Sequence, residues 1–328
     1  MANYNTIRGL RVKYLSADPS NPEDGQVWYN STTGNLRIDG ILVAGSWASG
    51  DALNTSRTDS SGTGATQSSM VTAGGYTGSA RTVNTELYNG SAWTETGNMS
   101  TARFAGGMAG TQTAAWYASG NSSPGGGRTA ATEEFGGSSW TSGGDVNTAR
   151  QQTAAQVGGS LTAGIMFGGN GGPTATEYYD GSSWTTQSGT LNVGRWNAIG
   201  TGTQTAAVMA GGEPPSTANV EEWNGSAWSE VNNLPGVRYN GMAGGNSQTA
   251  MKVIAGQNPG TIATCLDYDG TNWAAAPSIA TARALGAGSS ANTVATSFIS
   301  GGTSPPGSLT LTEEFTGATV VTKNISTS

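Results

Sequence analysis

The sequence predicts an all-β protein built from repeats of about 45 residues, and three observations carry this prediction. A nine-residue stretch, Thr176 to Trp184 (TEYYDGSSW), returns in six copies along the chain. The last position of the copies falls at residues 93, 140, 184, 228, 273 and 320, so the spacings are 47, 44, 44, 45 and 47 residues. The composition agrees, because 52 Gly and only 11% charged residues favour short strands joined by turns over helices. Such a period indicates one array of repeats rather than two separate domains.

Each copy has the pattern of two short strands joined by a tight turn. An aromatic residue is followed by Asn or Asp in four copies and then by Gly in all six. Asn-Gly and Asp-Gly tolerate positive φ at both central positions of a two-residue hairpin loop, so we expect such loops here. The aromatic residue and the Trp stand five positions apart, where they pack across the turn as apolar anchors. The Trp residues of this position, with one that opens the array, are Trp47, Trp93, Trp140, Trp184, Trp228 and Trp273.

An Arg follows each of these Trp residues by 10 or 11 positions. After the Arg come a strand of small residues and an apolar strand that ends in Gly or a Gly pair, so that each repeat predicts four strands. The acidic residue two positions before the aromatic, such as Glu177, is the expected ion-pair partner of a repeat Arg; in the fifth copy Leu266 takes its place. The alternative is a substrate-binding arginine cluster. The repeat arginines are Arg57, Arg103, Arg150, Arg195, Arg238 and Arg283.

This order of Arg, apolar strand with Gly pair, aromatic and Trp resembles the kelch repeat of β-propellers over residues 47–328. The resemblance implies a six-bladed β-propeller with four strands per blade, in which the first strand lines the central channel. WD40 repeats are the weaker alternative, because no Gly-His or Trp-Asp pairs recur at the repeat spacing. The last copy has Val320 in place of Trp. We therefore expect the strand ending at Trp47 to complete or flank the last blade and to join the two ends.

Residues 1–46 stand apart as an attachment arm and a small β-meander. Ile7 to Leu15 reads as a strand or extended arm, residues 18–25 as a turn-rich linker, and residues 26–43 as a three-strand meander with turns at 31–34 and 39–40. The stretch NPEDGQVWYNSTTGNLR, residues 21–37, resembles an element near the N-termini of bacteriophage tail, fibre and other virion proteins. That resemblance implies a structural protein of a virus particle.

Residues 1–35 are too few to bury a core of their own. They carry apolar and aromatic side chains at positions that a half-buried strand would use, namely Val12, Leu15, Trp28 and Tyr29. We therefore expect residues 1–35 to dock onto another virion protein by strand pairing and aromatic burial, while the propeller faces outward.

The composition argues against several classes of binding partner and of catalytic site. A net charge of −7 argues against a nucleic-acid partner, and the absence of His removes the commonest metal ligand and the usual general base. Cys265, the single Cys, cannot form an internal disulfide. Without a signal peptide or an apolar run near about 18 residues, we expect synthesis in the host cytoplasm, no membrane insertion and a final place in the virion. We expect no cofactor.

The function predicted from these observations is a non-enzymatic phage structural protein, of the tail or fibre adsorption apparatus, that contacts proteins or the host surface. Alternatives are a capsid-decorating protein, a carbohydrate-binding or glycan-hydrolysing propeller, and an intracellular kelch adaptor. A sialidase is considered because residues 179–184 resemble its Asp box. Catalysis is disfavoured because glycosidases use paired carboxylates, whereas the acids outside the repeat positions fall singly. Examples of these acids are Glu95, Asp145, Glu213 and Glu230.

The loops after the Gly pairs differ most between repeats, and we expect any binding surface to lie there, because binding residues on rigid scaffolds concentrate on loops. The alternative is that these loops are only solvated turns. The candidate residues are Tyr76, Asn121, Asn170, Glu213 and Asn258.

Overall fold

The computed structural model describes residues 12–20, 26–123, 125, 127–153, 157–171, 174–289 and 292–325. Within these ranges the chain is all-β, with many strands, a 3₁₀ turn at Val294–Thr296 and no α-helix. It forms two compact units. The repeat unit is Trp47–Thr316, and the terminal unit combines the residues up to Ser46 with those from Gly317 onward.

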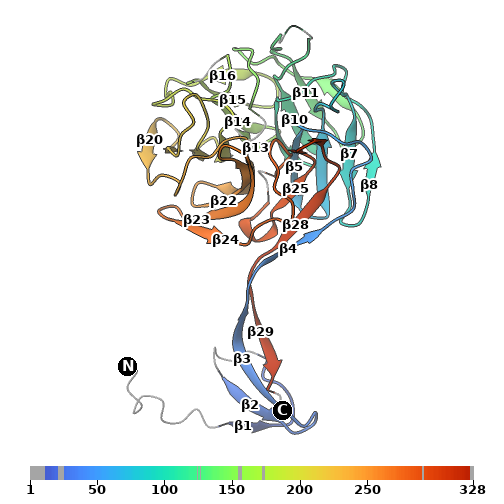
Figure 1. The fold of residues 1–328 in the computed structure, drawn as a ribbon, viewed down its shortest axis with the longest axis vertical. Helices are drawn as coiled ribbons and strands as arrows, with labels where there is room; N and C mark the ends of the chain where they lie inside the picture. The colour runs from blue at the N-terminus through green and yellow to red at the C-terminus, as the bar shows by residue number, and fades with distance from the viewer. Residues whose placement is uncertain are drawn as a thin grey trace. The chain divides into compact units, whose positions relative to one another are not determined.

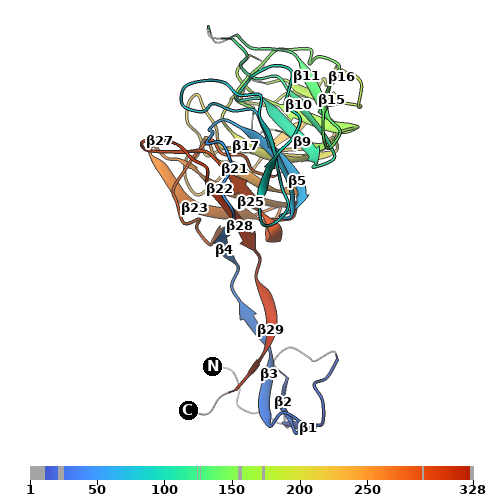
Figure 2. The ribbon, with the colours of Figure 1, turned by 90° about the vertical axis from the view of Figure 1, so that its right-hand side faces the viewer.

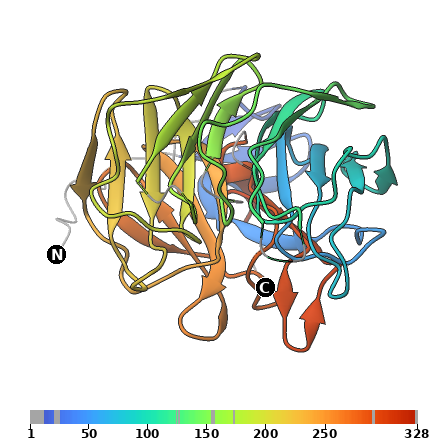
Figure 3. The ribbon, with the colours of Figure 1, turned by 90° about the horizontal axis from the view of Figure 1, so that it is seen from above.

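The repeat unit contains five antiparallel sheets of four strands that follow one another along the chain. Figures 1 and 3 show these sheets side by side in the order of the sequence. Their strands, with a short extra hairpin, are β5 Ser61–Thr66, β6 Ser69–Ala73, β7 Thr85–Tyr88, β8 Trp93–Glu95, β9 Gly107–Thr111, β10 Ala114–Ala118, β11 Thr132–Phe135, β12 Trp140–Ser142, β13 Val157–Ser160, β14 Ala163–Phe167, β15 Thr176–Tyr179, β16 Trp184–Thr186, β17 Ile199–Thr203, β18 Ala206–Ala210, β19 Val220–Trp223, β20 Trp228–Val231, β21 Met242–Ser247, β22 Ala250–Gln257, β23 Thr261–Tyr268, β24 Trp273–Ala276, and the hairpin strands β26 Thr303–Ser304 and β27 Gly307–Ser308. The predicted repeat of four strands is confirmed, and the fold is propeller-like.

Small residues on the first strand of each sheet let neighbouring sheets approach closely. The first strands of successive sheets, β5, β9, β13, β17 and β21, lie beside one another. A Cβ added at Gly158 would lie 2.2 Å from the carbonyl oxygen of Gly202 in the next sheet. Thr201 Oγ1 on β17 donates a hydrogen bond of 2.6 Å to the carbonyl of Gly245 on β21, which is the first strand of the neighbouring sheet. The Gly, Ala and Thr residues of these strands therefore serve close backbone packing.

The core lies between neighbouring sheets, and the repeat Trp residues anchor it. Trp184 meets Trp116 of the preceding sheet edge to face, with ring centroids 5.1 Å apart, and its Nε1 donates to Thr132 Oγ1 of that sheet at 2.9 Å. Trp93, Trp140 and Trp228 make the equivalent hydrogen bond to a Thr of the neighbouring repeat at 2.8–3.0 Å. Each repeat Trp also packs on a motif aromatic with ring centroids 4.6–5.5 Å apart, in the pairs Tyr88–Trp93, Phe135–Trp140, Tyr179–Trp184, Trp223–Trp228, Tyr268–Trp273 and Phe315–Trp47.

The sixth repeat builds its sheet from both ends of the repeat unit. β25 (Phe298–Ser300) pairs with β28 (Thr312–Thr316), and β4 (Ser46–Ser49) is the outer strand beside β28. Trp47 on β4 packs against Phe315 with ring centroids 5.2 Å apart, the contact that the motif Trp makes elsewhere. The strand that carries Trp47 thus occupies the outer position expected for it.

The hairpin turns differ from the expected two-residue loops. In the third repeat Tyr179 pairs directly with Trp184 across the hairpin, which leaves a four-residue loop, 180–183. Asp180 Oδ1 accepts the backbone N–H groups of Ser182 and Ser183, each at 2.8 Å, and φ is positive at Gly181 (95°) but not at Asp180. The prediction of two consecutive positive φ angles was wrong, because the side chain at the first loop position caps the turn. The same capping occurs at Asn89, Asn224 and Asp269.

The terminal unit is a four-stranded sheet in the order β1–β2–β3–β29 (Figure 2). β1 (Lys13–Leu15) runs parallel to β2 (Val27–Asn30), while β3 (Asn35–Val43) is antiparallel to both β2 and β29 (Thr319–Asn324). β3 is continuous through residues 39–40, so the expected turn there, and the three-strand meander with it, were wrong. The reason is that β29 pairs along both halves of β3 and keeps its backbone extended.

The C-terminal residues belong to this sheet and not to the repeats. From the sequence, residues 317–328 were assigned to the propeller, as the end of the sixth copy. In the structure, residues 319–324 pair with β3 instead, and β4 fills the vacated outer position of the sixth sheet. The physical reason is that the last copy lacks the Trp that anchors this strand in the other repeats.

Candidate functional site

The repeat arginines lie inside the sheets rather than on a binding surface. Arg238, in the repeat where Leu266 replaces the acid, donates to the carbonyl and the hydroxyl of Thr264 at 2.9 and 2.8 Å. Burial lowers the pKa of Arg150, and the neighbouring Glu177 carboxylate opposes this shift. Their burial argues against a substrate-binding arginine cluster. The buried ion pairs are Arg57–Glu86, Arg103–Glu133, Arg150–Glu177, Arg195–Glu221 and Arg283–Glu313.

A glycine after the second strand of each repeat connects that repeat to the arginine of the next. This glycine, the second of a Gly pair in four repeats and preceded by Ser119 or Ala255 in the other two, donates its backbone N–H to that arginine's carbonyl at 2.8–3.0 Å. A Cβ at Gly211, where φ is 65°, would lie 2.0 Å from the carbonyl oxygen of Arg238, so a side chain does not fit there. The six bonds form a cycle that returns to the first repeat: Gly75 to Arg103, Gly120 to Arg150, Gly169 to Arg195, Gly212 to Arg238, Gly256 to Arg283 and Gly302 to Arg57.

Four of the five candidate loop residues occupy one equivalent position, and Asn121 and Asn170 connect neighbouring repeats through side-chain hydrogen bonds. Asn121 is buried, accepts a hydrogen bond of 2.8 Å from Arg81 and donates one of 2.9 Å to Gln151. Asn170 accepts from Arg128 at 2.6 Å. Isolated β-bridges at equivalent positions of four repeats contain Tyr76, Asn121, Asn170 and Glu213. In the fifth repeat the bridge residue is Gln257, and Asn258, which follows it, is exposed. Their contacts favour a structural role for the first four.

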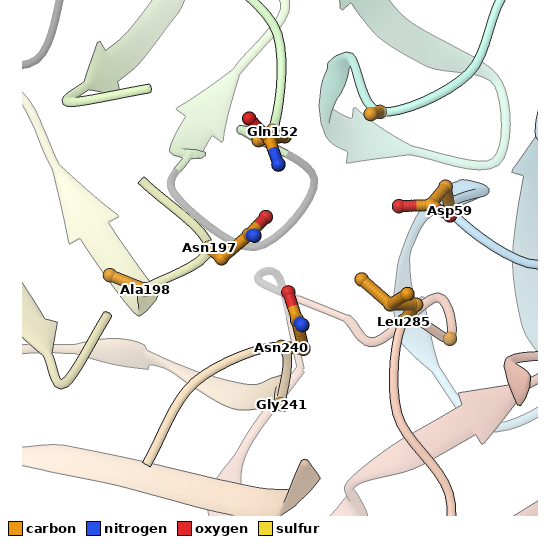
Figure 4. Close-up of a pocket in the computed structure, with 9 residues that line it drawn as sticks. Asp59, Gln152, Asn197, Ala198, Asn240, Gly241 and Leu285 are labelled. Carbon is orange, nitrogen blue, oxygen red and sulfur yellow. The ribbon is translucent and has the colours of Figure 1, made fainter. Parts of the chain in front are cut away.

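A central cavity lies inside a second cycle of backbone hydrogen bonds. Two residues after each repeat arginine the backbone takes a positive φ of 52–61°, at Asp59, Ala105, Gln152, Asn197, Asn240 and Leu285. Hydrogen bonds of 2.7–3.3 Å join these segments in sequence, and the N–H of Asp59 completes the cycle by donating to the carbonyl of Leu285. The cavity, which is partly open to solvent, has a volume of about 20 Å³, enough for about one water molecule. Figure 4 shows its lining residues.

Four polar side chains line this cavity: Asp59, Gln152, Asn197 and Asn240 (Figure 4). Asn197 Nδ2 donates to Glu213 Oε1 at 2.8 Å, whereas Asn240 Oδ1 is buried without a hydrogen-bond partner. Removal from water raises the pKa of the Asp59 carboxyl to about 6, opposed by a hydrogen bond from the Thr58 hydroxyl. The sequence analysis missed these residues, because different residue types share the position; the available signal was the fixed offset of two from each repeat arginine.

A second cavity, of about 430 Å³, opens among the turns between the first and second strands. Its lining has backbone, hydroxyl and amide groups and no aromatic or charged side chain. The amide of Gln204 is already engaged, because it donates to the carbonyls of Gly164 and Tyr179 at 3.0 and 3.1 Å. The remaining lining residues are Gly110, Thr111, Gly159, Ser160, Ala163, Gly202, Thr203, Thr205 and Asn246.

Two of the candidate acids outside the repeat positions lie opposite repeat acids on the neighbouring strand, Glu95 opposite Glu86 and Glu230 opposite Glu221. Both repeat acids are engaged in ion pairs with arginines. Asp145 is exposed, and Glu213 accepts a hydrogen bond from Asn197. Asp180, in the stretch that resembles an Asp box, is a turn cap whose pKa is lowered to about 2 by hydrogen bonds from the backbone and side chains of the loop. Among the described residues, no three His, Cys, Asp or Glu side chains form a group that could hold a metal ion.

The attachment residues of the terminal unit divide into buried and exposed ones. Trp28 is buried in this unit, and its Nε1 donates to Asp18 Oδ1 at 2.9 Å, so Trp28 needs no second protein for its burial. Leu15 and Tyr29 are half-buried, whereas Val12 is 51% exposed. Tyr14, absent from the residues predicted for attachment, is 75% exposed and stacks on Tyr29 with ring centroids 4.9 Å apart. The rest of the predicted docking segment, residues 1–11 and 21–25, lies outside the described residues.

Comparison with protein-family models gives no match, and comparison with curated proteins gives none either. In the part of the chain that the structure describes, no helix is long and apolar enough to cross a membrane.

Proposed function

We propose that this chain is a non-enzymatic structural protein of a bacteriophage particle, in the tail or fibre adsorption apparatus. The terminal unit attaches it to other virion proteins, and the repeat unit is displayed for contact with proteins or the host surface. The observation that carries the proposal is the construction of the terminal unit. Asp18 binds Trp28, Asn30 and Arg37, so most of the stretch that resembles virion proteins belongs to one connected folded element.

This folded element has an edge strand suited to attachment. Among the residues that the structure describes, β1 pairs with β2 on one side and with no strand on the other. Val12, beside the strand, and Tyr14, within it, are exposed apolar side chains. An edge strand with such side chains is a template for pairing with a strand of another protein, which gives main-chain hydrogen bonds and buried aromatic area together.

We further propose that the six repeats close into a six-bladed, kelch-like β-propeller. The two cycles of backbone hydrogen bonds, each passing through six repeats and returning to the first, support closure. The hydrogen bond from Trp93 Nε1 in the first repeat to Thr312 Oγ1 in the sixth, 3.0 Å long, supports it as well. A closed propeller removes sheet edges from the displayed unit and so suits a passive scaffold.

Attachment through β1 is testable in the full-length protein. The double substitution Val12→Glu and Tyr14→Glu places charge on the edge strand, and we expect its amount in purified particles to fall at least about tenfold, since charge on an edge opposes strand pairing. Val193→Glu is the matched control, because Val193 is an exposed apolar residue of the repeat unit, and it should incorporate normally. Circular dichroism checks that both variants fold. Normal incorporation of the double variant would show that attachment uses another surface.

We expect no glycan hydrolysis. The repeat acids are buried in ion pairs with arginines. The exposed Glu95 and Glu230 lie opposite two of these paired acids, Glu86 and Glu221, so the neighbouring carboxylate of each is already engaged by an arginine. Incubation with host-type polysaccharides, followed by assay of released reducing sugar, should give no signal above buffer. Sugar release that disappears in Glu95→Gln, Asp145→Asn or Glu213→Gln would establish an enzyme and overturn this expectation.

A further inference from the structure

We propose that the central cavity binds one Ca²⁺ ion, through the Asp59 carboxylate and the side-chain amide oxygens of Asn197 and Asn240. These three residues come from the first, fourth and fifth repeats, so a bound ion would connect strands far apart in the sequence. The inference does not depend on the proposed role in a virus particle.

The hydrogen bonds around the cavity leave oxygen atoms available to an ion. Glu213 can only accept hydrogen bonds, so its contact with Asn197 Nδ2 fixes the orientation of that amide and leaves Asn197 Oδ1 as the cavity-facing atom. Asn240 Nδ2 donates to Gln257 Oε1 at 2.6 Å, and Asn240 Oδ1 is buried without a partner. A buried acceptor without a partner costs free energy, which a cation or a water would relieve.

The fourth polar residue is arranged differently. Gln152 Oε1 accepts a hydrogen bond of 3.1 Å from Asn170 Nδ2, so the Gln152 amide nitrogen remains to face the cavity. An N–H group does not bind a cation directly, but it can orient a water that does. Ca²⁺ accepts carboxylate, amide and water oxygens in flexible geometry, and waters commonly complete its ligand set.

The charge around the cavity also favours a cation. Among the described residues, its lining contains the Asp59 carboxylate and no Lys or Arg. Arg57, two residues before Asp59, is engaged by Glu86. Glu213, which contacts Asn197, adds a further acidic side chain, and Tyr117 is the other titratable group that senses the charge of Asp59.

The size and the ligand set indicate weak binding by a single ion. A cavity of about 20 Å³ admits about one ion, and the waters that complete its ligand set would approach from the open side of the cavity. With one carboxylate as a ligand, we expect a dissociation constant of about 10⁻⁴–10⁻³ M, as in extracellular calcium modules with few charged ligands. Mg²⁺ requires near-ideal octahedral geometry and gives up water reluctantly, so we expect it to bind less well here.

The test uses the full-length protein. Isothermal titration calorimetry with CaCl₂ at pH 7.5 should show one site per chain, and millimolar Ca²⁺ should raise the melting temperature relative to chelator. Asp59→Asn, which keeps the side-chain shape, should abolish both effects. Asp145→Asn removes an exposed acid elsewhere and should keep both. Absence of Ca²⁺ binding to the wild type, or equal binding by Asp59→Asn, would overturn the proposal; an equal response to Mg²⁺ would overturn the choice of ion.

Discussion

Replacing Arg150 with Met should lower the free energy of unfolding by about 3–5 kcal/mol, because it leaves a buried carboxylate without its guanidinium partner. Glu177 would keep only the hydrogen bonds from Asn147, whose N–H lies 2.8 Å away. The carbonyls of Gly168 and Ala175 would also lose donors now 3.0 and 3.2 Å distant. Urea denaturation followed by Trp fluorescence measures the loss.

The fifth repeat supplies the matched control for this substitution. Arg238→Met removes an equivalent arginine, but Leu266 stands where the other repeats have the acid, so no carboxylate is left unpaired. We expect a clearly smaller loss than in Arg150→Met. The double variant Arg150→Met, Glu177→Leu should recover part of the stability, since replacing both members of a buried pair costs less than removing one. Equal losses in both single variants would assign the effect to packing of the arginine stem.

Replacing Trp184 with Ala should also cost about 3–5 kcal/mol, because it opens a cavity between two sheets. The side chain is 5% exposed, packs on Trp116 and Tyr179, and is hydrogen-bonded to Thr132. A solvent-facing platform for a ligand would instead lose affinity with little change in stability. The melting temperature and the urea midpoint of the variant distinguish these two roles.

Two further variants separate the contributions of this side chain. Trp184→Phe keeps most of the ring and removes the hydrogen bond, which should cost about 1 kcal/mol for the bond itself. Trp273→Ala should cost less than Trp184→Ala, because Trp273 is half-buried and its Nε1 donates to the Asn232 carbonyl. If Trp184→Ala left stability unchanged, the assignment of the repeat Trp as a core anchor would fail.

Much of the repeat unit could be predicted because the types of residue in the motif determine which side chains pack together. A Trp five positions after an aromatic must place both rings on adjacent strands, and the structure has this contact in each repeat, including Trp47 with Phe315. The identity of one neighbour even accounts for an exception. Trp273 would meet Val220, where four of the copies have Thr, and its indole N–H donates to a backbone carbonyl instead. Trp47 would meet Cys265 and likewise donates to a backbone carbonyl, that of Pro277.

The features that could not be predicted depend on backbone conformation or on distant pairing. Asp180 and Gly181 are compatible with both a two-residue loop and a capped four-residue loop, and the register across the hairpin decides between them. β29 pairs with β3 through backbone hydrogen bonds, and no local sequence motif predicts this pairing. The central cavity is built at a position where Asp59, Ala105 and Leu285 share only a positive φ, so no shared residue type marks it.

The pairing of β4 with β28 has a consequence for how the protein is made. Trp47 and Phe315 are 268 residues apart (315 − 47), so the sixth sheet has no outer strand in register until nearly the whole chain exists. At about 5–20 residues per second, a ribosome needs about 13–54 s to cover that distance, and contacts between such distant segments form slowly. During this delay the β4 segment waits without its partner. On a polysome, where nascent copies are crowded, the β4 segment of a neighbouring chain can pair with β28 instead. Exchange of this strand between copies is therefore the misassembly that we expect for this topology.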